Sequence, residues 1–278
     1  MNRLELAPSE WQPPYRLAIA DEAVGEAGEL LATVGGEPAV GQFLEWGARE
    51  ETLTQLTRFL RFGVKFQTIK ARNRRGFVRM SGIRAANEYF GTTPPEPPKK
   101  RYACRDGRLY EREPQYRAMI DEITVAAWRH FQEHFPLQAA AHEAVVKASI
   151  HPDWLIAGTP FTSGIVNDRS ALPYHKDAGN LVGTWSMMVA LRQHTEGGAL
   201  TLPELGMTLA IPDRSLTIFE GQRYWHGVTP MVYRKKDAYR FTLVWYVKQA
   251  IRQCGCRAEE PARASREATK VQDTYADD

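Results

Sequence analysis

Four residues with metal-binding or anion-binding chemistry follow one another in the chain: His175, Asp177, His226 and Arg240. Side chains alternate along a strand, so His175 and Asp177 share one face if residues 174–177 are extended. His226, from a distant strand, would complete a set of two imidazoles and one carboxylate. That set suits non-haem Fe(II), because it leaves coordination positions open for a co-substrate and oxygen. Arg240, on the next strand, would pair through its guanidinium with a carboxylate.

The order of these residues is more specific than any one of them. A His-x-Asp pair arises by chance, and a single histidine is more often a hydrogen-bonded core residue than a ligand. Here the pair follows a predicted strand, Trp225-His226-Gly227 follows a turn, and Arg240 lies within the apolar strand 239–246. We therefore predict one metal site from this set. The histidines outside it are expected to be structural or surface residues, namely those at 130, 134, 142, 151 and 194.

The composition predicts an ordinary soluble protein. The chain has 278 residues, 43% hydrophobic and 25% charged, which suffices for one sizeable core. No apolar run approaches 18 residues, and the N-terminus lacks the apolar core of a secretory signal, so neither a membrane span nor a signal peptide is expected. An odd number of cysteines, three, favours a reducing cytoplasm over a disulfide scaffold. Cys254-Gly255-Cys256 has no matching second pair and is not interpreted as a zinc site.

Positive charge is concentrated between Arg58 and Arg105. This segment holds 13 basic and two acidic residues, a net charge of +11 within a chain whose net charge is +3. Such a segment is a candidate footprint for a polyanion, although a solvated basic surface is the alternative. Interleaved aromatic residues could stack on bases or belong to the core. The residues that we expect to contact a nucleic-acid backbone are Lys70, Arg72, Arg74, Arg75 and Arg79.

Periodicity divides the chain into a helical part and a strand-rich part. Apolar spacing predicts one amphipathic helix around 40–62, ended by Gly63, and a second over 114–135, closed by Pro136. The basic stretch 64–105 is expected to be irregular, and the charged residues 257–278 exposed or disordered. Short apolar runs separated by turn residues predict an antiparallel sandwich or jelly roll. The expected strands lie near 161–167, 171–176, 184–191, 199–202, 206–211, 215–219, 226–229 and 239–248.

Three strings carry a family resemblance: Phe161–Asn167 (FTSGIVN), His175–Asn180 (HKDAGN) and Glu196–Gly206 (EGGALTLPELG). They resemble the Fe(II)/2-oxoglutarate oxygenases of the TET/JBP group, and more closely their bacteriophage and bacterial relatives that hydroxylate pyrimidine methyl groups in DNA. The resemblance covers roughly 90–260 and is strongest over 159–248. It implies an α+β fold in which N-terminal helices pack on a double-stranded β-helix, or cupin-like jelly roll. We expect one catalytic domain over 1–278, with a helical and basic part at 1–150, the β-helix at 151–250 and a charged tail at 251–278.

The resemblance also implies residue roles. His175, Asp177 and His226 match the metal ligands, Arg240 matches the arginine that pairs with the distal carboxylate of 2-oxoglutarate, and Thr242 a hydroxyl that assists it. Residues expected to contact the target base are Asn180, Tyr246 and Asn167. Each has a simpler alternative: the asparagines could cap turns, Tyr246 could be core, and Thr242 could be an ordinary strand residue.

The implied reaction is hydroxylation of the 5-methyl group of 5-methylcytosine or thymine, of which we favour 5-methylcytosine. It uses Fe(II), 2-oxoglutarate and O₂, yields succinate and CO₂, and requires a flipped or single-stranded nucleotide. Related halogenases replace the acid at the position of Asp177, so its presence favours hydroxylation. The cysteine-rich zinc region and the base-J-binding module of relatives are absent. A hydroxylase of a free small molecule and a non-catalytic cupin-like sensor are the alternatives. We expect a monomer that binds DNA and no membrane, in the cytoplasm of a bacterial or phage-infected host cell.

Overall fold

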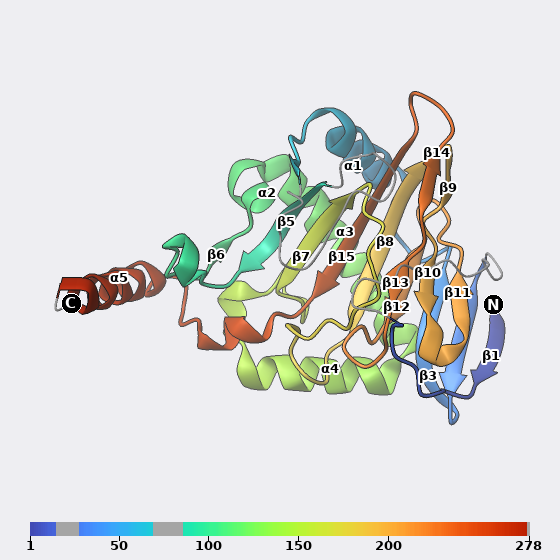
Figure 1. The fold of residues 1–278 in the computed structure, drawn as a ribbon, viewed down its shortest axis with the longest axis horizontal. Coiled ribbons are helices and arrows are strands. Elements are labelled where there is room, and N and C mark those ends of the chain that lie inside the picture. The colour runs from blue at the N-terminus through green and yellow to red at the C-terminus, as the bar shows by residue number, and fades with distance from the viewer. Residues whose placement is uncertain (15–27, 69–85, 277–278) are drawn as a thin grey trace.

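A large twisted sheet forms the centre of the fold in the computed structural model, which describes residues 1–14, 28–68 and 86–276 (Figure 1). Within the described residues this sheet has the strand order β1-β2-β3-β12-β8-β15-β7-β5-β4, and β6 pairs with β5. Two small sheets, β11-β10-β13 and β14-β9, lie apart from it. The strands are β1 (Asn2–Leu6), β2 (Leu30–Val34), β3 (Glu37–Phe43), β4 (Gln67–Thr68), β5 (Ala86–Thr93), β6 (Arg105–Asp106), β7 (Ser163–Asp168), β8 (Ser186–Gln193), β9 (Thr195–Gly197), β10 (Leu200–Leu202), β11 (Met207–Leu209), β12 (Leu216–Phe219), β13 (Gly227–Val228), β14 (Met231–Tyr233) and β15 (Tyr239–Tyr246).

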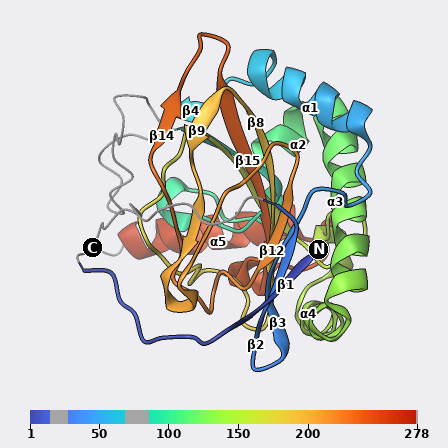
Figure 2. The same ribbon diagram turned by 90° about the vertical axis from the view of Figure 1, so that its right-hand side faces the viewer.

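The helices α1, α3 and α4 cover one face of the large sheet, and the small sheets cover the other (Figure 2). The α-helices are α1 (Glu50–Phe62), α2 (Arg108–Arg112), α3 (Pro114–His134), α4 (Pro136–Ser149) and α5 (Glu260–Ala276). Short 3₁₀ turns span Pro97–Lys99, Pro152–Trp154, Pro203–Leu205 and Gln249–Gln253. Among the described residues, none of these helices combines the length and apolar character needed to cross a bilayer.

Alternation along the central strands divides their side chains between two cores. The odd-numbered residues of β15, such as Leu243 and Trp245, are fully buried against the helices. Trp245 also donates its indole N–H to Thr124 Oγ1 of α3 at 2.7 Å, which fixes that helix on the sheet. The even-numbered residues of β15 therefore face the small sheets, where β8, β10 and β11 contribute a second apolar cluster. Arg240, Thr242 and Tyr246 all lie on this inner face.

The structure confirms the main helix and most of the predicted strands. The stripe predicted along α3 is buried from Tyr116 through Phe131, and β7, β8, β10, β11, β12, β13 and β15 all fall within the predicted ranges or extend them by no more than two residues. The segment 171–176 forms no strand; its one ladder contact is the bridge between His175 and His226.

The helix predicted around 40–62 is correct only in its second part. Residues up to Phe43 belong to β3, which pairs with β12, and Gly47 then adopts a left-handed conformation with φ of +79° that a helix does not accommodate. Phe43 and Trp46 pack into the same core as α1, which explains why their spacing resembled a helical stripe. The helix ends at Gly63 as predicted.

Several further elements were not predicted, among them β5, α4, α5 and the pair of β9 and β14. β5 lies in a stretch expected to be irregular, because its sequence ANEYFGTT lacks apolar alternation; pairing with β7 specifies it instead. Pro136 closes α3 but also begins α4. The charged segment expected to be exposed or disordered forms the helix α5, whose described side chains after Glu260 are exposed or half-buried. Glu260, its first residue, accepts hydrogen bonds from the backbone N–H groups of Cys104 and Gly255. Strands β9 and β14, which are far apart in sequence, form a small antiparallel sheet of their own.

Cys104 and Cys254 form a disulfide across 150 residues, with their Cα atoms 5.9 Å apart. The sequence analysis did not predict this pair, because it interpreted the odd number of cysteines as typical of a reducing cytoplasm; Cys256 is free. Spacing along the sequence carried no signal for the bond, because the two residues meet only when α5 and the segment before it return to β6.

Candidate metal and co-substrate site

Two histidines that are 51 positions apart are held side by side by the backbone. The N–H of His175 donates to the carbonyl of His226 at 2.8 Å, and the reverse bond measures 3.0 Å. Their rings lie 4.3 Å apart between centroids. Each Nδ1 contacts a backbone carbonyl, that of Pro173 at 2.8 Å and that of Tyr224 at 3.1 Å. Nδ1 is thus the protonated nitrogen in each ring, and Nε2 keeps its lone pair for a metal.

Asp177 completes the group. Its Oδ1 lies 3.7 Å from His175 Nε2 and 3.9 Å from His226 Nε2. The possible ligand atoms of all three residues lie within 4.8 Å of one another. Lys176, between the two ligands in sequence, points elsewhere and contacts Glu204 Oε1 at 3.1 Å. The alternation predicted for this segment therefore holds even though it is no regular strand.

The surroundings restrict the carboxylate of Asp177. Its backbone N–H donates to Gly221 O at 2.9 Å, and the Asn180 amide reaches its Oδ2 at 3.4 Å. A Cβ at Gly221 would lie 2.5 Å from the same Oδ2, so only glycine leaves room for this position of the carboxylate.

Burial keeps His226 in the form that binds metals. Burial and the neighbouring His175 lower the pKa of His226 to about 4, so its imidazole is neutral at physiological pH. Two imidazoles and one carboxylate, with positions left open, fit Fe(II).

Arg240 is a buried cation with no acidic partner among the residues that the structure describes. It is 1% exposed, and burial together with nearby Arg192 lowers its pKa to about 10. One guanidinium NH₂ donates to Gly198 O at 2.8 Å, while its Nε–H is buried and has no hydrogen-bond partner among the described residues. An unsatisfied buried donor on a cation is costly, and a carboxylate would satisfy it. The arrangement therefore fits the distal carboxylate of 2-oxoglutarate.

Backbone contacts connect Arg240 with the metal group. Strand β13 follows His226, and Thr229, the residue after β13, donates its N–H to Ala199 O at 3.0 Å. Gly198, the residue before Ala199, holds the guanidinium, and a Cβ there would lie 2.6 Å from Arg240 Nε.

The four residues predicted to assist co-substrate or base binding lie close to Arg240 or to Asp177, and they differ in the contacts that they make. Thr242 and Tyr246 share the inner face with Arg240, and Asn167 pairs in register with Thr242 and reaches its Oγ1 at 3.5 Å. Tyr246 interacts electrostatically with Asp177 and carries the Lys248 ammonium 5.1 Å from its ring centroid. Asn180 is buried, and both its amide and its backbone support Asp177, so its observed contacts are those of a residue that positions the carboxylate.

A cavity of about 700 Å³ opens beside Tyr246 and Gly179. Its other walls are formed mainly by β5 and the segment between β5 and α2, and four acids also line it: Glu88, Glu96, Asp106 and Glu111. Glu88 and Glu96 are paired with arginines. Its basic lining residues are Lys99, Arg101, Arg105, Arg108, Arg112 and Lys248. A cavity of this size and charge can take a phosphate-bearing ligand of nucleotide dimensions.

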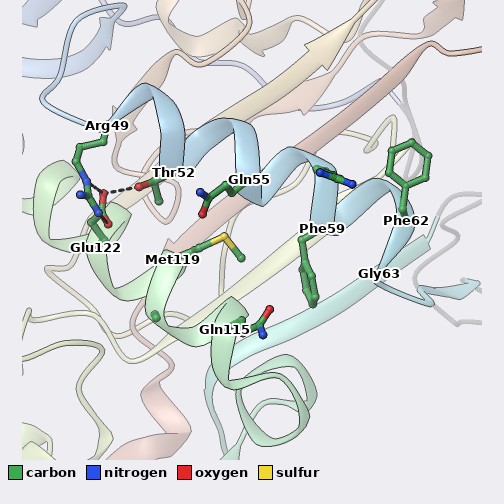
Figure 3. Close-up of a pocket in the computed structure, with 11 residues that line it drawn as sticks. Arg49, Thr52, Gln55, Phe59, Phe62, Gly63, Gln115, Met119 and Glu122 are labelled. Carbon is green, nitrogen blue, oxygen red and sulfur yellow. Dashed lines mark hydrogen bonds and ion pairs between the residues drawn. The ribbon is translucent and has the colours of Figure 1, made fainter.

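A second cavity of about 750 Å³ lies on the helical side, between α1 and α3 (Figure 3). Phe59, Met119 and Gln115 line it, and Arg49 pairs with Glu122 at one end. None of the predicted site residues that the structure describes borders it.

Some predicted site residues lie outside the part of the chain that the structure describes, and some residues of the observed site were not predicted. The five residues expected to contact a nucleic-acid backbone, Lys70, Arg72, Arg74, Arg75 and Arg79, lie outside the described residues. Gly198, Gly221 and Arg192 were not predicted as part of the site. The Gly197-Gly198 pair stood within the string Glu196–Gly206 that carries the family resemblance, but no role was predicted for it, and nothing in the sequence distinguished Gly221 or Arg192.

The chain belongs to the Tet_JBP family, the oxygenase domain of the 2OGFeDO superfamily, which it matches over residues 110–249. Fe(II), 2-oxoglutarate and O₂ are the cofactors of this superfamily. Curated relatives include thymine dioxygenase JBP1-A of Trypanosoma cruzi (strain CL Brener), 27% identical over 195 residues, and thymine dioxygenase JBP1 of Leishmania major, 27% identical over 189 residues. These matches cover 69% and 66% of this chain but 22% of each relative, so the chain spans about a fifth of their length.

Solved structures support the fold. The structure of NgTET1 in complex with 5mC DNA is similar with a TM-score of 0.59 and 13% identity, over 85% of this chain and 83% of that one. An oxidoreductase of the 2OG-Fe(II) oxygenase family from Burkholderia pseudomallei has a TM-score of 0.50 and 11% identity, over 78% and 88%. The predicted α+β class with a jelly-roll core is thereby confirmed.

Proposed function

We propose that this chain hydroxylates the 5-methyl group of a pyrimidine, 5-methylcytosine or thymine, in DNA. The reaction converts the methyl group, 2-oxoglutarate and O₂ into a hydroxymethyl group, succinate and CO₂. The observation that carries the proposal is the convergence of His175, Asp177 and His226, together with a buried arginine, Arg240, whose Nε–H has no hydrogen-bond partner among the described residues. The thymine dioxygenases among its relatives favour the substrate class.

Iron, when bound by His175, Asp177 and His226, would supply the oxidising chemistry for both the co-substrate and the methyl group. The residues of the protein position the co-substrate and the metal ligands. Arg240 holds the distal carboxylate of 2-oxoglutarate in a buried environment, where a charge-assisted pair fixes orientation, and Thr242 adds a hydroxyl on the same strand face. Gly221 and Asn180 keep the Asp177 carboxylate turned toward the two histidines.

The cavity beside Tyr246 is the proposed place for the target nucleotide. A methyl group within a duplex cannot reach a buried metal, so the nucleotide must be flipped or single-stranded, at a cost of about a few kcal/mol for unstacking. Stacking on Tyr246 and phosphate contacts from the cationic rim would offset that cost. Asn167, on the same inner face, is a further candidate for hydrogen bonds to the base. We assign the residues from Lys70 to Arg79 to the DNA backbone on their charge alone.

The test is mass spectrometry of nucleosides after incubation with two matched duplexes, one containing 5-methylcytosine and one containing thymine at the target position. Hydroxymethyl nucleoside should appear with one or both, only with Fe(II) and 2-oxoglutarate present. His175→Ala should abolish it, and His151→Ala, which removes an exposed histidine that pairs with Asp153, should not. Succinate release without modified nucleoside, but stimulated by a free small molecule, would instead support a small-molecule hydroxylase.

A further inference from the structure

A second group of metal-binding side chains lies on the last turn of α3. His130, Glu133 and His134 offer ligand atoms that all lie within 4.8 Å of one another. Positions i, i+3 and i+4 of a helix share one face, so the grouping follows directly from the sequence HFQEH. The sequence analysis assigned both histidines to structural or surface roles because it considered each of them singly.

Packing holds the two imidazoles in place. The ring of Phe43 lies 4.4 Å from that of His130 and 4.8 Å from that of His134, and the two histidine rings are 4.3 Å apart. The Nε2 atom of His130 is buried and has no hydrogen-bond partner among the described residues. Burial and the neighbouring His134 lower the pKa of His130 to about 4, so the ring is neutral at physiological pH.

The electrostatic field around His130, Glu133 and His134 favours the binding of a cation. The last turn of a helix carries partial negative charge from its free carbonyl groups, and α3 ends at His134. Glu133 belongs to the group itself, and the Glu29 carboxylate is close enough to act electrostatically on His130. Glu133 is exposed, so its carboxylate can move by the ångström or so needed to reach bond lengths of about 2.0–2.2 Å.

This group is separate from the candidate oxygenase site. α3 packs against the face of the large sheet that carries Trp245, as the bond from Trp245 to Thr124 shows. Arg240 and Thr242, with the metal group of His175, lie on the opposite face. The two sets of ligands share no residue, so one can be removed while the other is kept.

We propose that His130, Glu133 and His134 form a second site for a divalent transition-metal cation, of which Zn²⁺ is the best match. Two imidazoles and one carboxylate make up a three-ligand zinc set, and the fourth position would be taken by water or an external ligand. Because all three donors come from one helical turn, the metal binds the folded helix and not the unfolded chain. Zinc binding should therefore stabilise the junction between α3 and α4.

The experiment is a titration of the metal-free full chain with Zn²⁺, followed by calorimetry and by elemental analysis after desalting. Four proteins are compared: the wild type, His175→Ala, His134→Ala and the double variant. His151→Ala serves as the control for loss of an unrelated partly exposed histidine. Circular dichroism verifies that each variant is folded, and Glu133→Gln, which changes only an exposed carboxylate, provides a second test should His134→Ala fail to fold.

The proposal predicts two zinc equivalents for the wild type and for His151→Ala, one for each of the single variants His175→Ala and His134→Ala, and none for the double variant. In the His175→Ala background, Glu133→Gln should weaken the remaining site at least tenfold, and Zn²⁺ should raise the melting temperature only while His134 is present. If His175→Ala binds no zinc, or if His134→Ala leaves stoichiometry and affinity unchanged, the histidines of α3 are an aromatic stack without metal. Either result leaves the oxygenase proposal intact.

Discussion

Replacing Gly221 by alanine tests how tightly the structure specifies the position of the metal-binding carboxylate. A Cβ at this residue would lie 2.5 Å from Asp177 Oδ2 and 3.3 Å from Asp177 Cγ, with Phe219 at 3.2 Å on another side. Ordinary contact begins at 3.4 Å, so the carboxylate oxygen must retreat by roughly 0.9 Å. Metal–ligand distances tolerate only about 0.2 Å.

We therefore expect Gly221→Ala to weaken metal affinity by about 10- to 100-fold, or about 1.4–2.8 kcal/mol, the range found when groups that orient metal ligands are removed. The backbone at Gly221 is not left-handed, so alanine acts through this contact and not through backbone strain. The assay is a titration with Co²⁺, a spectroscopic substitute for Fe(II), in a background that carries His134→Ala so that only one site is observed.

Gly179→Ala is the matched control, because a Cβ there meets only the flexible end of Lys248, at 3.3 Å. It should bind the metal like the wild type. If Gly221→Ala also binds Co²⁺ with wild-type affinity, then Asp177 is not held in its ligand position by this glycine, and the argument from close packing fails.

Three further predictions concern the co-substrate, pH and DNA. Arg240→Lys keeps the charge but loses the planar fork, so the KM for 2-oxoglutarate should rise at least tenfold, consistent with about 1.5–3 kcal/mol for a charged hydrogen bond; an unchanged KM in succinate-release assays would remove this arginine from the co-substrate site. Burial lowers the pKa of His142 to about 4, against about 6.5 in an unfolded chain, so its contribution to stability is full above pH 6.5 and is lost as the pH falls toward 4. Denaturant unfolding should show that the wild type loses about 2 kcal/mol more between pH 7 and pH 5 than His142→Ala does, and equal losses would refute the assignment. Charge reversal at Arg72, Arg74 and Arg75 should lower DNA affinity and flatten its salt dependence, as measured by fluorescence anisotropy, whereas unchanged binding would exclude this segment from the interface.

The iron ligands could be predicted because their chemistry is visible in the sequence. His175 and Asp177 are adjacent on one face whether or not the segment is a regular strand, since alternation needs only an extended backbone. His226 and Arg240 stand in a fixed order after them, and the structure brings all four to one region. The residues that orient them were not visible. Gly198 and Gly221 act by having no side chain where a guanidinium or a carboxylate approaches, and such a role appears only once distant segments are in contact.

The helices and strands that were predicted correctly have a local sequence pattern, whereas the missed ones depend on contacts between distant segments. α3 carries a long apolar stripe, and its periodicity alone identified it. β5 has no such pattern in its sequence. Pairing with β4 on one side and β7 on the other determines its extended conformation. The part of the helix prediction that failed, before Glu50, contains residues that pack into the helical core from a strand and a loop. Burial was predicted there, and the local backbone was not.

The measurement that tests the central claim most directly is the ratio of succinate released to hydroxymethyl nucleoside formed on one methylated duplex, in the wild type and in His226→Ala. If His175, Asp177 and His226 hold a single iron that oxidises the co-substrate and the base together, the wild type should give one succinate for each hydroxymethyl group, and His226→Ala should give neither product. Hydroxymethyl nucleoside formed without 2-oxoglutarate, or undiminished turnover by the variant, would contradict the account.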